Sequence, residues 1–253
     1  MPRPTRRSDP GKKPYCSAVV AAAGASQRMG GEDKLFAELA GVPVLARALL
    51  ALQNSDLIDE IVVVARADSL ERVSALCGEH GISKATKVMA GGATRLISVL
   101  TGALAVSDKA SLLAIHDGAR PCVGRDVIEK AVDAAASCHA AAPGIPVTST
   151  VKKVEGGIVR YTANREGLYE VQTPQVFDVD LIKAALTNSM NNGFDVSDDC
   201  LAAELIGAPV CITEGSPENI KITTIADLRL AEAILLGRGV SSSNPAPLNA
   251  AAT

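Results

Sequence analysis

The feature that most constrains this chain is the regular alternation of short apolar runs with segments of helical periodicity. Residues 61–65 read Ile-Val-Val-Val-Ala and are bounded by charge, which is typical of a buried strand. Similar runs lie at 17–22, 85–89, 111–115 and 140–147. Because strands that alternate with helices form right-handed βαβ units, we predict an α/β, Rossmann-like fold whose mostly parallel sheet is flanked by helices.

The segments between these runs carry helical spacing. Pro43 suits a helix start, and apolar residues recur behind it as far as Leu52. Asp68 is expected to cap a second helix that runs to about His80. The remaining pattern predicts a strand at 210–213 and helices at about 94–106, 127–138, 179–191, 197–206 and 224–236.

Composition excludes several classes of protein. Hydrophobic residues make up 47% of the chain but aromatic residues only 2%, so the core must be built from Ala, Val, Leu and Ile. A net charge of −3 argues against a nucleic-acid partner that needs a broad basic face. No apolar run approaches the roughly 18 residues of a membrane span. The six cysteines are scattered without a C-x-x-C pair, which indicates small core residues in a reducing, cytoplasmic setting.

The two ends differ in composition from the rest. Residues 1–14 are basic and Pro-rich with no apolar stretch, so we predict a disordered basic tail and not a secretory signal. Residues 239–253 consist largely of Ser, Asn, Pro and Ala, and are predicted to be a second disordered tail. A single domain is expected over 15–238.

The alternation breaks after residue 147. Two β-rich segments flank Gly156-Gly157, a pattern typical of a hairpin, and we predict a protruding arm over about 150–172. Apolar residues alternate along it: Val151, Val154, Ile158 and Tyr161. Since two isolated strands are not stable alone, the arm needs a surface to pack on. A second subunit is the natural candidate, which predicts a homodimer.

Three loops are expected to meet in one crevice, because ligands of such sheets bind beyond the carboxyl ends of the strands. They span 23–34, 91–98 and 116–121. The first is Gly-rich but is neither a Walker A loop, since no G-K-[ST] follows, nor a dinucleotide loop, since Ser26 replaces the second Gly. Arg28 and Lys34 within it suit a triphosphate.

The third loop offers a carboxylate and a guanidinium. Asp117 follows an apolar strand, where it can hold Mg²⁺ or simply make a turn. Arg120 can bind phosphate bidentately. His116 is interpreted as a packing or hydrogen-bonding residue rather than a catalyst.

Taken together, these segments resemble a known family. The loop at 22–34 and the stretch from His116 to Pro121 are joined by three further motifs: Gly91-Gly-x-x-Arg95-x-x-Ser98-Val, Thr173-Pro-Gln175 and Asn219-Ile-Lys221-Ile-Thr223. This combination is similar to that of the 2-C-methyl-D-erythritol 4-phosphate cytidylyltransferases of the non-mevalonate isoprenoid pathway, over about 16–237. The chain departs from the family at Asp33 and Leu35, where Pro and Gln are usual, and at Ala93, where an acidic residue is usual.

The resemblance implies a nucleotidyltransferase domain over 15–238 that moves the cytidylyl group of CTP onto a polyol phosphate. It implies that Arg28 and Lys34 stabilise charge on the α-phosphate, and that Asp117 contacts the nucleotide and ligates Mg²⁺ or another divalent cation. The cytosine and ribose would be held at Ala22, Ala23, Gly24, Gly92 and Ser98. The acceptor would be oriented by Arg165 and Lys221, in a pocket lined by Arg120, Thr150, Thr173 and Ser197. The partner subunit's arm would supply Thr150 and Arg165.

Two alternatives remain open from the sequence. A ribitol-5-phosphate cytidylyltransferase has the same fold and a similar acceptor, so Arg165 and Lys221 would serve either substrate. A non-catalytic nucleotide-binding protein on this scaffold would be expected to lack Arg28, Lys34 or Asp117, and all three are present.

Overall fold

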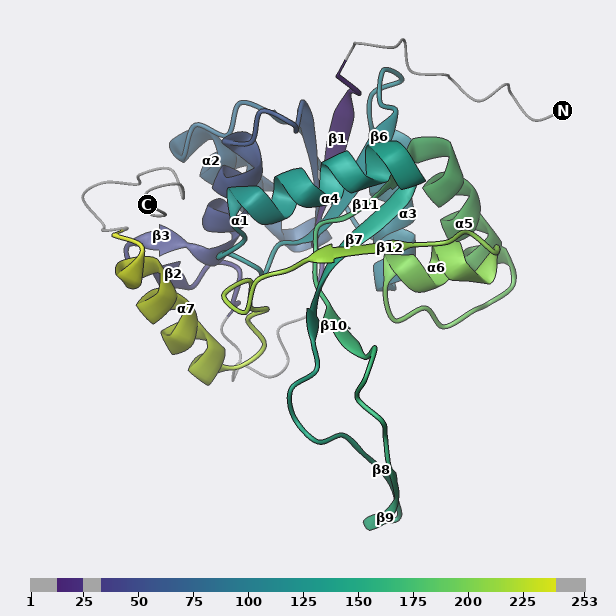
Figure 1. Ribbon diagram of the computed structural model, residues 1–253. Helices are drawn as coiled ribbons and strands as arrows, with labels where there is room; N and C mark the ends of the chain where they lie inside the picture. Colours follow the sequence, from purple (N-terminus) through teal and green to yellow (C-terminus); the bar gives the residue numbers. More distant parts are fainter. Residues whose placement is uncertain (1–12, 25–32, 240–253) are drawn as a thin grey trace, which may run out of the picture.

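The computed structural model describes residues 13–24 and 33–239 (Figure 1). Their centre is an eight-stranded sheet in the order β10-β7-β11-β6-β1-β4-β5, with β12 beside β7. The strands are β1 (Cys16–Ala22), β4 (Glu60–Ala65), β5 (Ala85–Ala90), β6 (Leu112–Asp117), β7 (Ala140–Pro146), β10 (Tyr169–Val171), β11 (Gln175–Asp178) and β12 (Cys211–Glu214). Arg28 and nearly all of both expected tails lie outside the described residues.

The parallel part of the sheet confirms the prediction from apolar runs. β1 pairs in parallel with β4 on one side and β6 on the other, and β5 continues the sheet beside β4. The strand pattern did not predict β11, which lies antiparallel between β6 and β7 and makes the sheet mixed. Only Val176 and Phe177 of its four residues are apolar, and the place of the strand is fixed by pairing with β6 and β7, which are far away in sequence.

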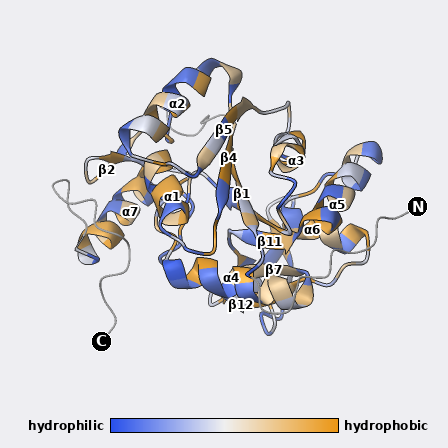
Figure 2. Cartoon of the chain, turned by 90° about the horizontal axis from the view of Figure 1, so that it is seen from above, coloured by the Kyte–Doolittle hydropathy of each residue, from blue (hydrophilic) through white to orange (hydrophobic). Residues whose placement is uncertain are grey.

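Helices cover both faces of the sheet (Figure 2). One face packs against α1 (Val44–Gln53), α2 (Leu70–Glu79) and α4 (Arg125–Cys138). The other packs against α3 (Arg95–Ala105), α5 (Val179–Asn191) and α6 (Asp199–Leu205). No helix in the described part of the chain is long and apolar enough to cross a membrane.

The core is aliphatic, as composition requires. Successive side chains of β1 point to opposite faces, so Ala18 and Val20 enter one apolar cluster and Val19 the other. Four of the six cysteines are buried, as predicted: Cys16, Cys77, Cys122 and Cys200. A third cluster joins α7 (Ile225–Gly237) to the small hairpin of β2 (Glu38–Leu39) and β3 (Val42–Pro43).

Three helix starts differ from the prediction, and the simplest case is α4, which begins at Arg125 and not at Val127. Asp68 does not cap α2, because residues Ala67–Ser69 form a 3₁₀ turn and the Asp68 carboxylate accepts a hydrogen bond from Arg66 Nε at 3.0 Å. The expected cap at Asp68 is therefore wrong. α6 begins at Asp199, two residues later than predicted, because Asp198 caps it and its Oδ1 accepts from Leu201 N at 3.0 Å.

A two-stranded hairpin projects from the body at residues 152–162 (Figure 1). It consists of β8 (Lys152–Glu155) and β9 (Ile158–Thr162), joined at Gly156 and Gly157 with φ of 58° and 79°. These positive φ angles are why glycine occupies the turn. Every residue of both strands is exposed within this single chain.

Candidate active site

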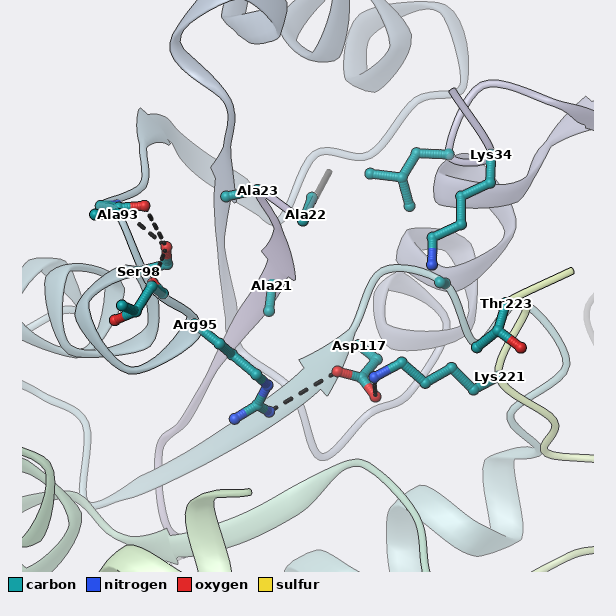
Figure 3. Close-up of a pocket in the computed structure, with 15 residues that line it drawn as sticks. Ala21, Ala22, Ala23, Lys34, Ala93, Arg95, Ser98, Asp117, Lys221 and Thr223 are labelled. Atoms are coloured by element: carbon teal, nitrogen blue, oxygen red, sulfur yellow. Dashed lines mark hydrogen bonds and ion pairs between the residues drawn. The ribbon is translucent and has the colours of Figure 1, made fainter. Parts of the chain in front are cut away.

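A cavity opens at the carboxyl ends of β1, β5 and β6 (Figure 3). It encloses about 390 Å³, within the roughly 300–1,000 Å³ of small-molecule sites. Eight of the residues predicted for the site line it: Ala22, Ala23, Gly24, Lys34, Gly92, Ser98, Asp117 and Lys221. The crevice predicted between three loops is thus confirmed for the described residues.

Strand register explains why these loops meet. Ala21 of β1 is opposite Asp117 of β6, and Ala65 of β4 is opposite Ala90 of β5. The loops after β1 and β5 then approach so closely that a Cβ on Gly91 would lie 2.7 Å from both Ala23 Cβ and Ser98 Oγ. Gly91 is required for this contact, since any side chain would push the loops apart.

The start of α3 forms one wall of the cavity. Thr94 caps the helix by accepting a hydrogen bond from Ile97 N at 3.2 Å. Ser98 Oγ accepts from Gly92 N at 3.1 Å and donates to Thr94 O at 2.8 Å. The wall therefore presents a preformed turn whose own polar groups are largely paired.

Asp117 lies at the centre of a cluster of cations. Its carboxylate is 2.9 Å from Lys221 Nζ, 3.4 Å from Arg120 Nε and 3.8 Å from Arg95 Nη2. Burial alone would raise its pKa, but Lys221, then Arg95 and Arg120, lower the pKa of Asp117 to about 2. The carboxylate is consequently ionised at neutral pH.

The position of Lys221 is fixed by its buried neighbour Ile222. Ile222 is fully buried in the cluster under α7, and its N donates to Ala119 O at 2.8 Å. Lys221 and Thr223 on either side both line the cavity. Lys34 Nζ donates to Ile222 O at 3.0 Å, which brings the two lysines to one side of the cavity (Figure 3).

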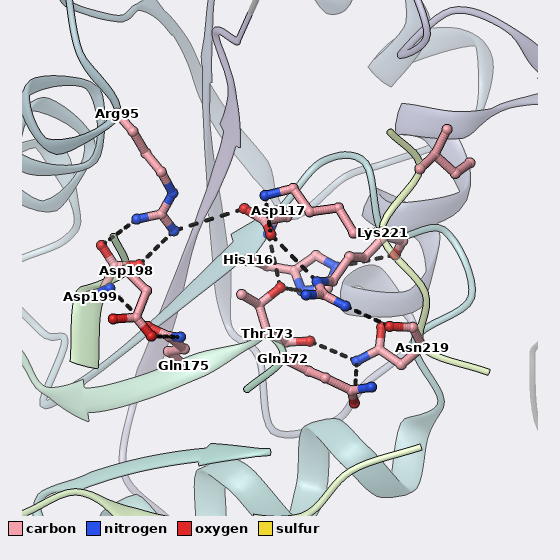
Figure 4. A network of polar contacts seen from close by, with 12 residues as sticks. Arg95, His116, Asp117, Gln172, Thr173, Gln175, Asp198, Asp199, Asn219 and Lys221 are labelled. Carbon is pink, nitrogen blue, oxygen red and sulfur yellow. Dashed lines mark hydrogen bonds and ion pairs between the residues drawn. The ribbon is translucent and has the colours of Figure 1, made fainter. Parts of the chain in front are cut away.

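A buried network of hydrogen bonds holds the backbone of Asp117 in place (Figure 4). Thr173 Oγ1 accepts from Asp117 N at 3.1 Å and lies 3.0 Å from His116 Nδ1. His116 Nε2 lies 3.3 Å from Arg120 O, which can only accept, so Nε2 carries the proton and donates. In the neutral ring Nδ1 is then the acceptor, and the Thr173 hydroxyl donates to it. Burial lowers the pKa of His116 to about 4, so the ring is neutral. The hydrogen-bonding role predicted for His116 is confirmed.

Comparison with known proteins then decides the family. A family model described as 2-C-methyl-D-erythritol 4-phosphate cytidylyltransferase matches residues 16–237, nearly the whole described chain. The chain belongs to this cytidylyltransferase family.

Individual relatives agree over the same length. Two proteins named 2-C-methyl-D-erythritol 4-phosphate cytidylyltransferase, from Halalkalibacterium halodurans and Dehalococcoides mccartyi, are each 43% identical to it. The matches cover 87% and 88% of this chain and 96% of each relative. A crystal structure of 4-diphosphocytidyl-2C-methyl-D-erythritol synthase from Anaerococcus prevotii matches with a TM-score of 0.78 at 29% identity, covering 88% of this chain and 97% of that one. The 2-C-methyl-D-erythritol 4-phosphate cytidylyltransferase from Thermus thermophilus gives 0.72 at 31%, covering 87% and 98%.

Not every residue predicted for the cytidylyltransferase site lines the cavity. Arg120 lies behind Asp117 and donates to Asn219 O at 2.6 Å, and Thr173 is buried with its hydroxyl engaged as described. Thr150 and Arg165 lie on the arm, where Arg165 donates to Thr148 O. Ser197 is exposed just before α6.

Seven of the cavity residues were not assigned a role from the sequence, and Arg95 and Thr223 are two of them. Arg95 and Thr223 line the cavity, and both belong to motifs that carried the family resemblance. Arg95 directly follows the capping Thr94, so its place at a helix start was readable from the sequence. The sequence did not predict which carboxylates Arg95 contacts, because these residues are distant along the chain.

His116 should make the protein sensitive to acid. Its ordinary pKa of 6.5 falls to about 4 in the folded state, so the unfolded chain takes up the proton first as the pH drops. Above pH 6.5 the ring is neutral in both states and its contribution to the free energy of unfolding is fully present. As the pH falls from 6.5 to 4, this contribution of roughly 3 kcal/mol is lost.

The measurement is urea unfolding across this pH range for wild type and His116→Gln. The variant should be less stable at neutral pH but show a shallower loss of unfolding free energy on acidification. His139→Asn, which changes an exposed histidine in the left-handed region at φ 66°, should track the wild type. Parallel curves for all three proteins would show that His116 does not carry this sensitivity.

Proposed function

We propose that this protein transfers the cytidylyl group of CTP to 2-C-methyl-D-erythritol 4-phosphate, giving 4-diphosphocytidyl-2-C-methyl-D-erythritol and pyrophosphate in isoprenoid precursor biosynthesis. Membership of the cytidylyltransferase family supports the assignment. The observation that carries it is the placement of Lys34, Lys221 and the ionised Asp117 around one cavity, opposite the Gly92–Ser98 wall. This arrangement suits a triphosphate on one side and a phosphate monoester on the other.

The reaction needs charge stabilisation more than acid–base catalysis. A phosphate oxygen of the acceptor attacks the α-phosphorus of CTP, and a new P–O bond forms as the bond to the bridging oxygen of pyrophosphate breaks. The electron pair leaves with pyrophosphate. The acceptor phosphate is already largely anionic at neutral pH, so no strong general base is required. The main barrier is the approach of two anions, which the ammonium groups of Lys34 and Lys221 offset. Arg28, which lies outside the described residues, is proposed to contribute in the same way.

The nucleotide is placed on the wall formed by the first two loops. Backbone groups at Ala22, Ala23 and Gly24 would hold the cytosine and ribose together with Gly92 and Ser98. All five residues line the same cavity. Because backbone amides and carbonyls read the exocyclic amine, CTP should be preferred over UTP.

Asp117 is the residue suited to a divalent cation. Among residues 13–24 and 33–239, no group of three or more His, Cys, Asp and Glu gathers as a complete metal site. Mg²⁺ is commonly held by one or two carboxylates plus substrate phosphates, and the ionised Asp117 in the cavity fits that mode. A bound Mg²⁺ would neutralise charge on the phosphate oxygens.

The residues proposed for the acceptor are divided between the cavity and the arm, which supports a homodimer. Lys221 lines the cavity, but Arg165 and Thr150 belong to the arm at 150–172 and do not line it. The arm also carries exposed apolar side chains, with Ile158 65% and Tyr161 59% accessible. An exposed apolar two-stranded edge is an association hazard unless it is covered. We propose that each arm packs on the other subunit, where Arg165 completes the partner's acceptor site.

The function is tested by pyrophosphate release with each of the four nucleoside triphosphates, paired with 2-C-methyl-D-erythritol 4-phosphate or ribitol 5-phosphate. We expect turnover with CTP and the methylerythritol phosphate. A preference for ribitol 5-phosphate would reassign the acceptor, and equal use of UTP would indicate a general sugar-nucleotide enzyme. CTP binding without pyrophosphate release would favour a non-catalytic protein.

The shared site is tested with a mixed dimer. Arg165→Ala and Lys34→Ala subunits, each nearly inactive alone, should form a hybrid in which one of the two sites has both residues. That hybrid should regain activity. A hybrid as inactive as its parents, or a fully active monomer in sedimentation, would show that each chain carries its site unaided.

A further inference from the structure

Arg95 joins two parts of the site that are far apart in sequence (Figure 4). It is the first residue of α3, immediately after the nucleotide loop. Its Nη1 and Nη2 donate to Asp199 Oδ1 and Oδ2 at 2.9 and 2.7 Å, and Nη2 lies 3.8 Å from Asp117 Oδ1. The two parallel hydrogen bonds to Asp199 fix the plane of the guanidinium as well as its position.

Asp199 is itself held at the start of α6. Gln175 Oε1 accepts from Asp199 N and Cys200 N at 3.0 and 3.1 Å, and Gln175 Nε2 donates to Asp198 Oδ2 at 2.9 Å. Gln175 belongs to β11, which pairs with β6 beside Asp117. The start of α6 is therefore tied to the sheet through Gln175 and to the nucleotide wall through Arg95.

We propose that Arg95 is a positioning residue for the acceptor phosphate, an inference that rests on the proposed function. Through Asp199 it holds the turn from Ser197 to Asp199 against the Asp117 side of the cavity. It also neutralises the Asp199 carboxylate, whose side chain is only 1% exposed. Without Arg95 the turn would lose its tether to α3, and the Asp199 carboxyl would be left buried without its cation partner.

The nucleotide side should be much less sensitive to Arg95. The hydrogen bonds that shape it use Gly92 N, Thr94 Oγ1 and Ser98 Oγ, and none involves the Arg95 guanidinium. Removal of the guanidinium leaves these bonds in place. Substitution of Arg95 should therefore raise the KM of the acceptor and leave the KM of CTP nearly unchanged.

The test is steady-state kinetics on Arg95→Met, Arg95→Lys and the double variant Arg95→Met/Asp199→Asn. Arg95→Met should raise the KM of the methylerythritol phosphate by about tenfold or more while changing the KM of CTP by less than about twofold. Arg95→Lys keeps the charge but loses the bidentate contact with Asp199, so its acceptor KM should lie between those of the wild type and Arg95→Met. The double variant removes the unpaired carboxylate and should recover part of the loss.

Controls separate positioning from loss of fold. Thermal unfolding is followed for each variant, and the double variant keeps the test valid if Arg95→Met does not fold, because it has no buried unpaired charge. Arg125→Met, which changes a half-exposed arginine paired with Asp56 and Glu129, should leave both KM values unchanged. Equal changes in both KM values, or an unchanged acceptor KM, would overturn the positioning role. A wild type that transfers no cytidylyl group would instead overturn the proposed function.

Discussion

Lys34→Ala should lower kcat by about 10²–10³-fold while leaving the fold intact, the loss seen when one charge-stabilising donor is removed from an active site. Lys34 lines the cavity and its Nζ is held at 3.0 Å from Ile222 O, close to the strand ends where we propose that the phosphates bind. Its side chain contributes to no apolar cluster, so the loss should be in turnover and not in stability. Arg28→Ala is expected to act in the same direction, because the family resemblance implies the same role for Arg28.

The measurement is kcat from pyrophosphate release, with thermal unfolding as the check on folding. Lys130→Ala is a matched control, because Lys130 is a half-exposed lysine that pairs with Glu214 on the surface. It should retain wild-type turnover. Near-native turnover in both Lys34→Ala and Arg28→Ala would show that these cations do not stabilise the transferring phosphoryl group.

Asp117→Asn should lower activity by about 10²-fold and shift the dependence on Mg²⁺ to higher concentrations, because an amide is a poorer ligand for a hard cation. The pKa of Asp117 is lowered to about 2, so the wild-type carboxylate stays ionised at any practical assay pH. The substitution also leaves Lys221 without its partner at 2.9 Å. Both effects act on the reacting phosphates.

A titration of activity against Mg²⁺ separates the two effects. Loss of the ligand moves the midpoint of the titration, whereas a misplaced Lys221 lowers the plateau. Asp56→Asn, at an exposed carboxylate that pairs with Arg125, should match the wild type in both. A midpoint unchanged in Asp117→Asn would remove this carboxylate from the metal site.

Local sequence signals predicted most of the frame that carries the site. The run at 61–65 became a fully buried strand because β-branched apolar side chains suit a parallel strand whose two faces are both covered by helices. The predicted helix cap at Asp68 was wrong because another side chain competes for its carboxylate. Asp68 is a good capping residue, yet Arg66 engages its carboxylate and the helix starts after it.

The sequence by itself determined the class of fold, the three loops at the strand ends and the family, since each depends on residues close together in the chain. Tertiary structure alone decided the insertion of β11 beside β6 and the pairing of Arg95 with Asp199, 104 residues away. It also decided that the buried Thr173 hydroxyl forms hydrogen bonds with Asp117 N and His116 Nδ1. Hydrophobic periodicity and turn chemistry act over a few residues, whereas ion pairs and strand order depend on which distant segments the folded core brings together.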